Sequence, residues 1–295
     1  MDALLQPQLD LLQQSFAQRI VPVLGGQVAV RESGTRSDAP AVVFLHGISS
    51  GAASWLQVAL AVGAQHHVLA WDAPGYGEST PLEMPAPRAA DYAARLHALL
   101  QAEGIDRCVL VAHSLGALMA GSYAHGLGRN VVQRVVLISP AGGYGQSGNE
   151  AAAERVRTER RGALAEQGVA GIASRIANRL LSPGADATAR AFVQWNAARL
   201  HAAGYLQAVE LLAGADLGAS APLACPVEVH CGDADVVTSP AACRGLATRF
   251  DAPFATIANA GHASHAEQPQ AVAQIVLRAL SHQTQTKSTE TSTHG

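Results

Sequence analysis

One serine of this sequence occupies a position typical of a nucleophile. Residues 109–117 read VLVAHSLGA, so an apolar run predicted to be a buried strand leads directly into Ser114, and a predicted helix follows at once. A serine between a strand and a helix lies on a tight, strained turn that projects its hydroxyl group above the sheet edge. Small residues are needed two positions before and after it. Gly116 fits, and Ala112 departs from the usual glycine by one methyl group.

A serine hydroxyl becomes a good nucleophile only when a neighbouring base accepts its proton. Of the twelve histidines, His262 is favoured because it follows the last predicted strand, whereas we expect His265 to lie on the surface beyond it. A carboxylate should then fix the imidazole tautomer and stabilise its charged form. Asp235 follows another predicted strand, 27 residues before His262, which predicts both at one sheet edge. We interpret Asp233 as a turn residue that supports this loop.

Acyl transfer also requires hydrogen-bond donors for the charge that develops on the substrate's carbonyl oxygen. The sequence offers two backbone N–H groups, one at Leu115 behind the serine and one at Ile48 in the loop after an earlier strand. His46 begins that loop and resembles a second base, but we interpret it as a histidine that braces the loop beside the substrate pocket. We expect His113 to line the same pocket.

The composition excludes several other chemistries. The sole lysine, Lys287, lies in a polar, Ser/Thr-rich tail, residues 283–295, that we predict to be disordered. Schiff-base chemistry, pyridoxal phosphate and a P-loop each need a lysine inside the fold, so all three are excluded. With 15% charged residues and a net charge of −3, no nucleic-acid partner is expected. Four dispersed cysteines predict neither a disulfide scaffold nor a zinc site, and we expect no metal or cofactor.

The beginning of the chain predicts an amphipathic helix, residues 1–25, that packs on the body of the protein. Five apolar residues follow helical spacing there: Leu5, Leu9, Leu12, Phe16 and Ile20. The segment lacks the basic start and unbroken apolar run of a secretion signal, and no stretch approaches the ~18 apolar residues of a membrane span. Together with the cysteine content, these features predict a cytoplasmic protein that is not bound to a membrane.

Short apolar segments alternate with longer helical ones along most of the chain. Strands are predicted at Ala41–Leu45, Val68–Trp71, Cys108–Ala112, Val135–Ile138, Val227–His230 and Phe254–Ile257, and helices around 54–63, 88–103, 116–126, 239–249 and 267–282. Most of these strands are continuously apolar, as strands covered on both faces should be. The pattern predicts an α/β fold, a parallel sheet with helices on both faces. Gln27–Arg31 is expected to add an antiparallel edge strand.

One connection is too long for a single crossover helix. Residues 141–222 contain no convincing strand and are rich in Ala, Leu, Arg and Glu, which favour helices. We predict that they form a cap, or lid, of three or four short helices over the nucleophile, inserted between two parts of one core, residues 26–140 and 223–282. A helical subdomain without such a role is the alternative. Phe192 and Trp195 share one helix face, and we expect at least one of them to line the substrate pocket.

In chain order these segments resemble the α/β-hydrolase superfamily. The resemblance covers about residues 26–282 and rests on His46-Gly47, WDAPGYGES at 71–79, the serine turn, the long insertion, Gly232-x-x-Asp235, and Gly261-His262 with Glu267-x-Pro269. It implies an eight-stranded, mostly parallel sheet, a helical cap over Ser114, and a structural role for the turn at Asp72.

The resemblance also implies an activity. It points to a serine hydrolase that cleaves an ester, lactone or thioester of a small to medium, largely apolar substrate, as carboxylesterases and enol-lactone hydrolases do. Epoxide hydrolases and haloalkane dehalogenases of this superfamily use an aspartate nucleophile, and hydroxynitrile lyases an active-site lysine. Carbon–carbon bond hydrolases usually have asparagine and tryptophan where this chain has His113 and Ala263. They stay an alternative, as do cofactor-free haloperoxidase-like perhydrolases and non-catalytic ligand-binding members. The oligomeric state is open.

Overall fold

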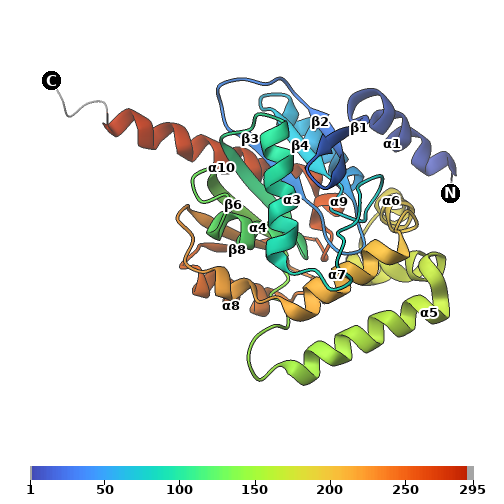
Figure 1. Ribbon diagram of the computed structural model, residues 1–295. Coiled ribbons are helices and arrows are strands. Elements are labelled where there is room, and N and C mark those ends of the chain that lie inside the picture. The colour runs from blue at the N-terminus through green and yellow to red at the C-terminus, as the bar shows by residue number, and fades with distance from the viewer. Residues whose placement is uncertain (1, 291–295) are drawn as a thin grey trace.

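An eight-stranded sheet forms the centre of the molecule in a computed structural model that describes residues 2–290, with side chains from residue 3 to residue 281 (Figure 1). The strands are β1 Gln18–Val23, β2 Gly26–Ser33, β3 Ala41–Leu45, β4 Val68–Trp71, β5 Cys108–His113, β6 Val132–Ile138, β7 Val227–Gly232 and β8 Phe254–Ile257. Their order is β1-β2-β4-β3-β5-β6-β7-β8. The pairs β1/β2 and β2/β4 are antiparallel, and all other pairs are parallel. The α/β fold with a mostly parallel eight-stranded sheet is thereby confirmed.

The central strands are apolar on both sides because two cores cover them. Val43 and Leu45 of β3 pack into the core on one face, and Val42 and Phe44 pack into the core on the other. Successive side chains of a strand point to opposite faces, so a strand between two cores needs an unbroken apolar run. The first core includes residues of α3 Ala89–Ala102, α4 Gly116–His125 and α8 Pro240–Arg249. The second includes residues of α1 Asp2–Ser15, η1 Ala52–Trp55, α2 Leu56–Gly63 and α10 Pro269–Glu290.

Between β6 and β7 the chain forms helices and no strand, in a stretch that the structure describes completely. The helices are α5 Glu150–Leu180, α6 Ala187–Ala197, α7 Ala202–Gly214 and η2 Leu217–Ser220. Gly168 interrupts α5 with a φ of 62°, so this long helix consists of two joined parts. Figure 1 shows α5, α6 and α7 gathered on the side of the molecule away from the C-terminus. Gly204 in α7 meets Gly75 of the core so closely that a Cβ at Gly204 would lie 1.9 Å from the Gly75 carbonyl oxygen.

The prediction of one helix over residues 1–25 was wrong beyond Ser15. The helix ends there, and β1 follows from Gln18 to Val23 as the true edge of the sheet, so β2 is antiparallel but lies inside it. Pro22 has no N–H to donate within a helix, and the positive φ angles of Gly25 and Gly26 make the turn between the two strands. Ile20, placed on the helical face by its spacing, belongs to this edge strand.

At the other end, α10 continues to Glu290 and so includes residues 283–290 of the tail that was predicted to be disordered over 283–295. Neither glycine nor proline follows Pro269 within this helix, and a helix without such a residue has no strong signal to stop. Residues 291–295 of the predicted tail lie outside the described residues. The six predicted parallel strands agree with the structure, and three of them have identical bounds.

Candidate active site

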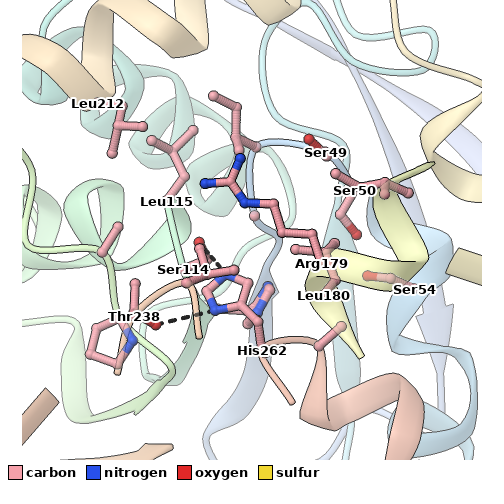
Figure 2. Close-up of a pocket in the computed structure, with 18 of the residues that line it drawn as sticks. Ser49, Ser50, Ser54, Ser114, Leu115, Arg179, Leu180, Leu212, Thr238 and His262 are labelled. Carbon is pink, nitrogen blue, oxygen red and sulfur yellow. Dashed lines mark hydrogen bonds between the residues drawn. The ribbon is translucent and has the colours of Figure 1, made fainter. Parts of the chain in front are cut away.

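Ser114 lies on the strained turn that its sequence context predicted. Its φ of 51° falls in the left-handed region, directly after β5 and before α4. The backbone of α4 approaches β3 so closely that a Cβ at Gly116 would lie 2.6 Å from the carbonyl oxygen of Leu45. A glycine is therefore required two positions after the serine. The turn directs the Ser114 hydroxyl group out of the sheet edge into a cavity (Figure 2).

His262 connects Ser114 to a buried carboxylate. Its Nε2 lies 2.9 Å from Ser114 Oγ, and its Nδ1 lies 2.9 Å from Asp235 Oδ2. The three side chains follow β5, β8 and β7, whose carboxyl ends meet at one edge of the parallel sheet. Thr238, which the sequence reasoning missed, places its Oγ1 3.1 Å from His262 Nδ1 and 2.9 Å from Asp235 Oδ2. Figure 2 shows the contacts of His262 with Ser114 and Thr238 as dashed lines.

The environment of Asp235 keeps its carboxylate ionised. Burial by itself would raise the pKa of Asp235, but the hydrogen bond and charge of His262 and the N–H groups of Thr238 and Val237 outweigh it and lower this pKa to about 2. Those two N–H groups donate to Asp235 Oδ1 at 2.9 and 2.7 Å. Asp233 instead accepts hydrogen bonds from the backbone of residues 259 and 260, which makes it a support for the loop before His262.

The two predicted oxyanion donors both border the cavity. Ile48 and Leu115 both line it, and neither backbone N–H donates a hydrogen bond to any other described residue. The hydroxyl group of Tyr76 donates to the carbonyl oxygen of Ile48 at 2.7 Å and so holds this loop. Two N–H groups without a partner among the described residues thus border the cavity that contains Ser114.

His46 does not line the cavity, so its placement at the substrate pocket was wrong, whereas its interpretation as a brace agrees with the structure. Its Nδ1–H donates to the carbonyl oxygen of Gly47 at 2.8 Å, and its Nε2 accepts from the N–H of Ala73 at 3.0 Å. Both ring nitrogens are thus used within the loops, and burial lowers the pKa of His46. Asp72 has a similar role, because its Oδ1 accepts from the N–H of Ala52 at 2.7 Å.

The cavity above Ser114 has a volume of about 380 Å³ and mainly apolar walls. Phe192 in α6 lines it, as expected, but Trp195 does not. Trp195 stacks on the outer side of Phe192, with ring centroids 5.6 Å apart, and the guanidinium group of Arg199 covers it at 4.9 Å. Residues three apart on a helix point in directions about 60° apart, so only one of the two rings reaches the cavity.

His265 is buried, so the expectation that it lies on the surface was wrong. Only 2% of it is exposed, and its ring centroid lies 4.4 Å from that of His113 and 4.5 Å from that of Trp55. Burial lowers the pKa of His265 to about 3. The short helix α9 Ser264–Glu267 turns the chain back under the cavity at this point, a feature that the sequence pattern after the last strand did not indicate.

His113, predicted at the pocket, lines the cavity and also supports His262. Its Nε2–H donates to the carbonyl oxygen of His262 at 2.9 Å. Burial, followed by the charges of His265 and His262, lowers the pKa of His113 well below its usual range. A neutral imidazole with its proton on Nε2 is the form that this contact needs. His113 and His265 thus form a neutral layer beneath His262.

The inserted helices are tied directly to the loop that carries His262. The N–H of Ala263 donates to the carbonyl oxygen of Leu180, at the end of α5, at 2.8 Å. The carboxylate of Glu267 accepts from the N–H groups of Gly261 at 2.8 Å and Ser182 at 3.0 Å, and from the Ser182 hydroxyl group. This clamp joins the insertion to the core beside the site. Glu267 is part of the family resemblance, but its partner Ser182 carried no recognisable signal in the sequence.

The described residues contain no group of three or more His, Cys, Asp and Glu side chains that could hold a metal ion. Over the same residues, no helix combines the length and the apolar character needed to cross a membrane.

Comparison with known proteins yields a family and several partial relatives. The family model described as "Alpha/beta hydrolase family" matches residues 42–275. A haloalkane dehalogenase of Bradyrhizobium diazoefficiens is 35% identical over 102 residues, which are 35% of this chain and 32% of that protein. A putative carbamate hydrolase RutD of Klebsiella pneumoniae is 40% identical over 86 residues, or 28% of this chain and 30% of that protein. The chain therefore matches about a third of the length of these curated relatives.

Solved structures resemble the chain over most of its length. The enol-lactonase of Burkholderia xenovorans LB400 has a TM-score of 0.80 at 22% identity and covers 89% of this chain and 100% of its own. A thermophilic esterase of Thermogutta terrifontis has a TM-score of 0.76 at 20% identity, with coverages of 90% and 99%. At such identities the likeness establishes the shared fold.

Proposed function

Because this chain belongs to the alpha/beta hydrolase family, we propose that it is a serine hydrolase that forms an acyl-enzyme on Ser114. Its substrate is an ester, lactone or thioester of small to medium size and largely apolar character. The observation that carries the proposal is the continuous contact from Asp235 through His262 to Ser114, with both distances at 2.9 Å, at the base of a cavity of about 380 Å³. Cavities of that volume suit small molecules rather than polymers.

In the proposed reaction, Ser114 Oγ attacks the substrate carbonyl carbon while His262 Nε2 accepts the hydroxyl proton. The charge that develops on the carbonyl oxygen is stabilised by the N–H groups of Ile48 and Leu115. The ionised Asp235 holds the proton on His262 Nδ1 and stabilises the imidazolium. That imidazolium protonates the leaving group, and a water molecule, deprotonated by His262, then releases the acyl group from Ser114.

The partial match to a haloalkane dehalogenase does not favour that activity here. Attack of a serine oxygen on an alkyl halide would produce an alkyl ether, which water cannot cleave under mild conditions, and the enzyme would stop after one turnover. A carbamate, by contrast, has an acyl carbon that the same three residues could attack, so carbamates belong among the compounds to be tested.

We further propose that residues 141–222 act as a lid, which excludes water and shapes the pocket. This proposal is supported by the hydrogen bonds that join the insertion to the His262 loop. Cytoplasmic location, a small-molecule substrate and the absence of a nucleic-acid partner are part of the same proposal. Support comes from four free cysteines and from a cavity without room for a polymer.

A substrate panel tests the proposed function. Esters, lactones, thioesters, carbamates and vinylogous diketones are compared, with Ser114→Ala as the blank. We expect turnover of at least one acyl class, a burst of nitrophenol from an activated ester, and labelling of one site per chain by a fluorophosphonate; all three should vanish in the variant. Turnover that survives in Ser114→Ala would contradict the serine mechanism. A protein that neither turns over nor accepts the label would belong with the non-catalytic members of the fold.

A further inference from the structure

The charged side chains that line the cavity are all positive. Arg160 and Arg179, both from α5, border it, and no aspartate or glutamate is found among its lining residues. The nearest carboxylate to the reacting atoms, Asp235, lies behind His262 and is engaged by it. The wall of the pocket is thus partly apolar and carries two cationic groups, of which Arg160 is half-buried and Arg179 is exposed.

Unlike Arg157 and Arg161, these two arginines have no carboxylate partner among the described residues. Arg157 and Arg161, on the same helix, both pair with Glu210, at 2.9 and 2.6 Å. Arg160 donates only to the hydroxyl group of Tyr205, at 3.3 Å. The side chain of Arg179 makes no hydrogen bond or ion pair with any residue from 3 to 281. Its guanidinium group points into the cavity from α5, on the side of Ser114 and Leu115 (Figure 2).

The position of Arg179 is fixed relative to the reacting residues. It is the penultimate residue of α5, and the next residue, Leu180, accepts the hydrogen bond from Ala263 that ties the helix to the His262 loop. Three residues after Arg179, Ser182 is held by Glu267. An arginine on a freely moving surface helix would have no defined place over the serine. Here the clamp anchors the backbone of Arg179 beside His262.

We infer that the substrate of this site carries a free carboxylate, which Arg179 binds with Arg160 as the second cation, at a distance from the bond that is cleaved. The inference rests on the proposed function and specifies its substrate class. A guanidinium group matches a carboxylate with two parallel N–H···O bonds, and such bonds are strong where neighbouring walls are apolar. Phe192, Leu212 and Leu246 supply those walls, so the remainder of the substrate is apolar.

Two activated esters with the same acyl chain test this assignment. One is the mono-4-nitrophenyl ester of glutaric acid, and the other is its methyl-capped, neutral counterpart. We expect the wild-type kcat/KM to favour the acid by about tenfold or more, the size typical of a hydrogen-bonded ion pair in a partly enclosed site. R179M should bring the ratio of the two values close to one, and R179K should keep part of the preference. Free glutarate should inhibit competitively in the wild type and more weakly in R179M.

Arg175 supplies the matched control, because it lies one turn earlier on the same helix, exposed and outside the cavity lining. R175M should keep the wild-type ratio of the two kcat/KM values. If R175M lowers this ratio as much as R179M does, the preference for the acid comes from the general positive charge of the helix, and the inference is overturned. Equal kcat/KM for the acid and the neutral ester in the wild type would also overturn it.

If either result occurs while Ser114→Ala abolishes hydrolysis, the proposed function stands. Hydrolysis that persists in Ser114→Ala would instead remove the proposed function. Melting temperature and fluorophosphonate labelling verify that R179M is folded with a reactive serine.

Discussion

The Nε2 atom of His262 lies 2.9 Å from the Oγ atom of Ser114, although 148 residues separate the two in the chain. The contact arises because β5 and β8 are strands of one sheet, and the loops after parallel strands emerge at the same edge. An inserted helical segment lies between the two residues in sequence and is itself bonded to the His262 loop. The serine and the histidine therefore meet beneath the insertion that we propose as a lid.

This contact predicts that Ser114 and His262 act as one unit. Replacing either with alanine should lower kcat by at least about a thousandfold, because the hydroxyl group is a poor nucleophile without a base and the base has no purpose without it. The double variant should be little worse than either single one. Steady-state kinetics on an activated ester measure all three. Losses that multiply would mean that the two residues act independently.

The second prediction separates the two aspartates of the β7 loop. Asp235→Asn should leave His262 free to adopt the wrong tautomer and should lower kcat by a factor on the order of ten thousand. Asp233→Asn is the matched control, with the same change two residues away. It weakens only the hydrogen bonds to the backbone before His262, so its main effect should be a lower melting temperature. The reverse ranking of the two kcat values would move the carboxylate's role to Asp233.

The third prediction concerns the wall of the pocket. Phe192→Ala should change the order in which acyl chains of different length are preferred, because the ring lines the cavity. Trp195→Ala should leave that order as it is, since the indole lies on the far side of Phe192. The ranking of kcat/KM over a series of esters measures both. If Trp195→Ala also reorders the substrates, the two stacked rings shape the pocket together.

The fourth prediction is a loss of stability in mild acid. A histidine whose pKa falls to about 3 on folding, as that of His265 does, is neutral in the folded state but charged in the unfolded state below about pH 6.5. The unfolded state then binds the extra proton, so the free energy of unfolding falls with falling pH between about 6.5 and 3. From pH 7 to 5, His265 should contribute a loss of about 2 kcal/mol.

Urea unfolding at pH 7 and pH 5 measures this loss. His265→Leu should lose less stability than the wild type between the two conditions, by that amount, whatever its stability at pH 7. The control His201→Leu replaces an exposed histidine and should show the wild-type pH dependence. If His265→Leu loses as much stability as the wild type between pH 7 and pH 5, the proton taken up on unfolding binds to another residue, with His113 as the next candidate.

Local sequence determined most of the sheet and the strained serine turn. The six parallel strands were predictable because a strand covered on both faces must be apolar throughout, a constraint visible within five residues. The turn at Ser114 was predictable because the close approach of a strand and a helix leaves room only for small residues such as Gly116. The placement of Asp235 and His262 at one sheet edge was predictable because loops after parallel strands share that edge.

Other features depended on contacts between segments distant in the chain. β1 was not predicted because its apolar residues also fit the spacing of the preceding helix. Only its pairing with β2 shows that this segment is a strand and not a continuation of the helix. The burial of His265 depends on α9 folding under Trp55, and the support of His262 by Thr238 depends on how the β7 and β8 loops meet. Neither depends on the identities of adjacent residues.

The inserted helices show the same division most clearly. Their helical character follows from composition, but the sequence does not say which of Phe192, Trp195 and the five arginines from 157 to 179 faces Ser114. The orientation of α5 depends on the bonds that tie Leu180 and Ser182 to the segment around His262. With α5 held in this way, Arg179 faces the cavity. A helix's periodicity defines its faces, whereas only its packing partner decides which face becomes the wall of a site.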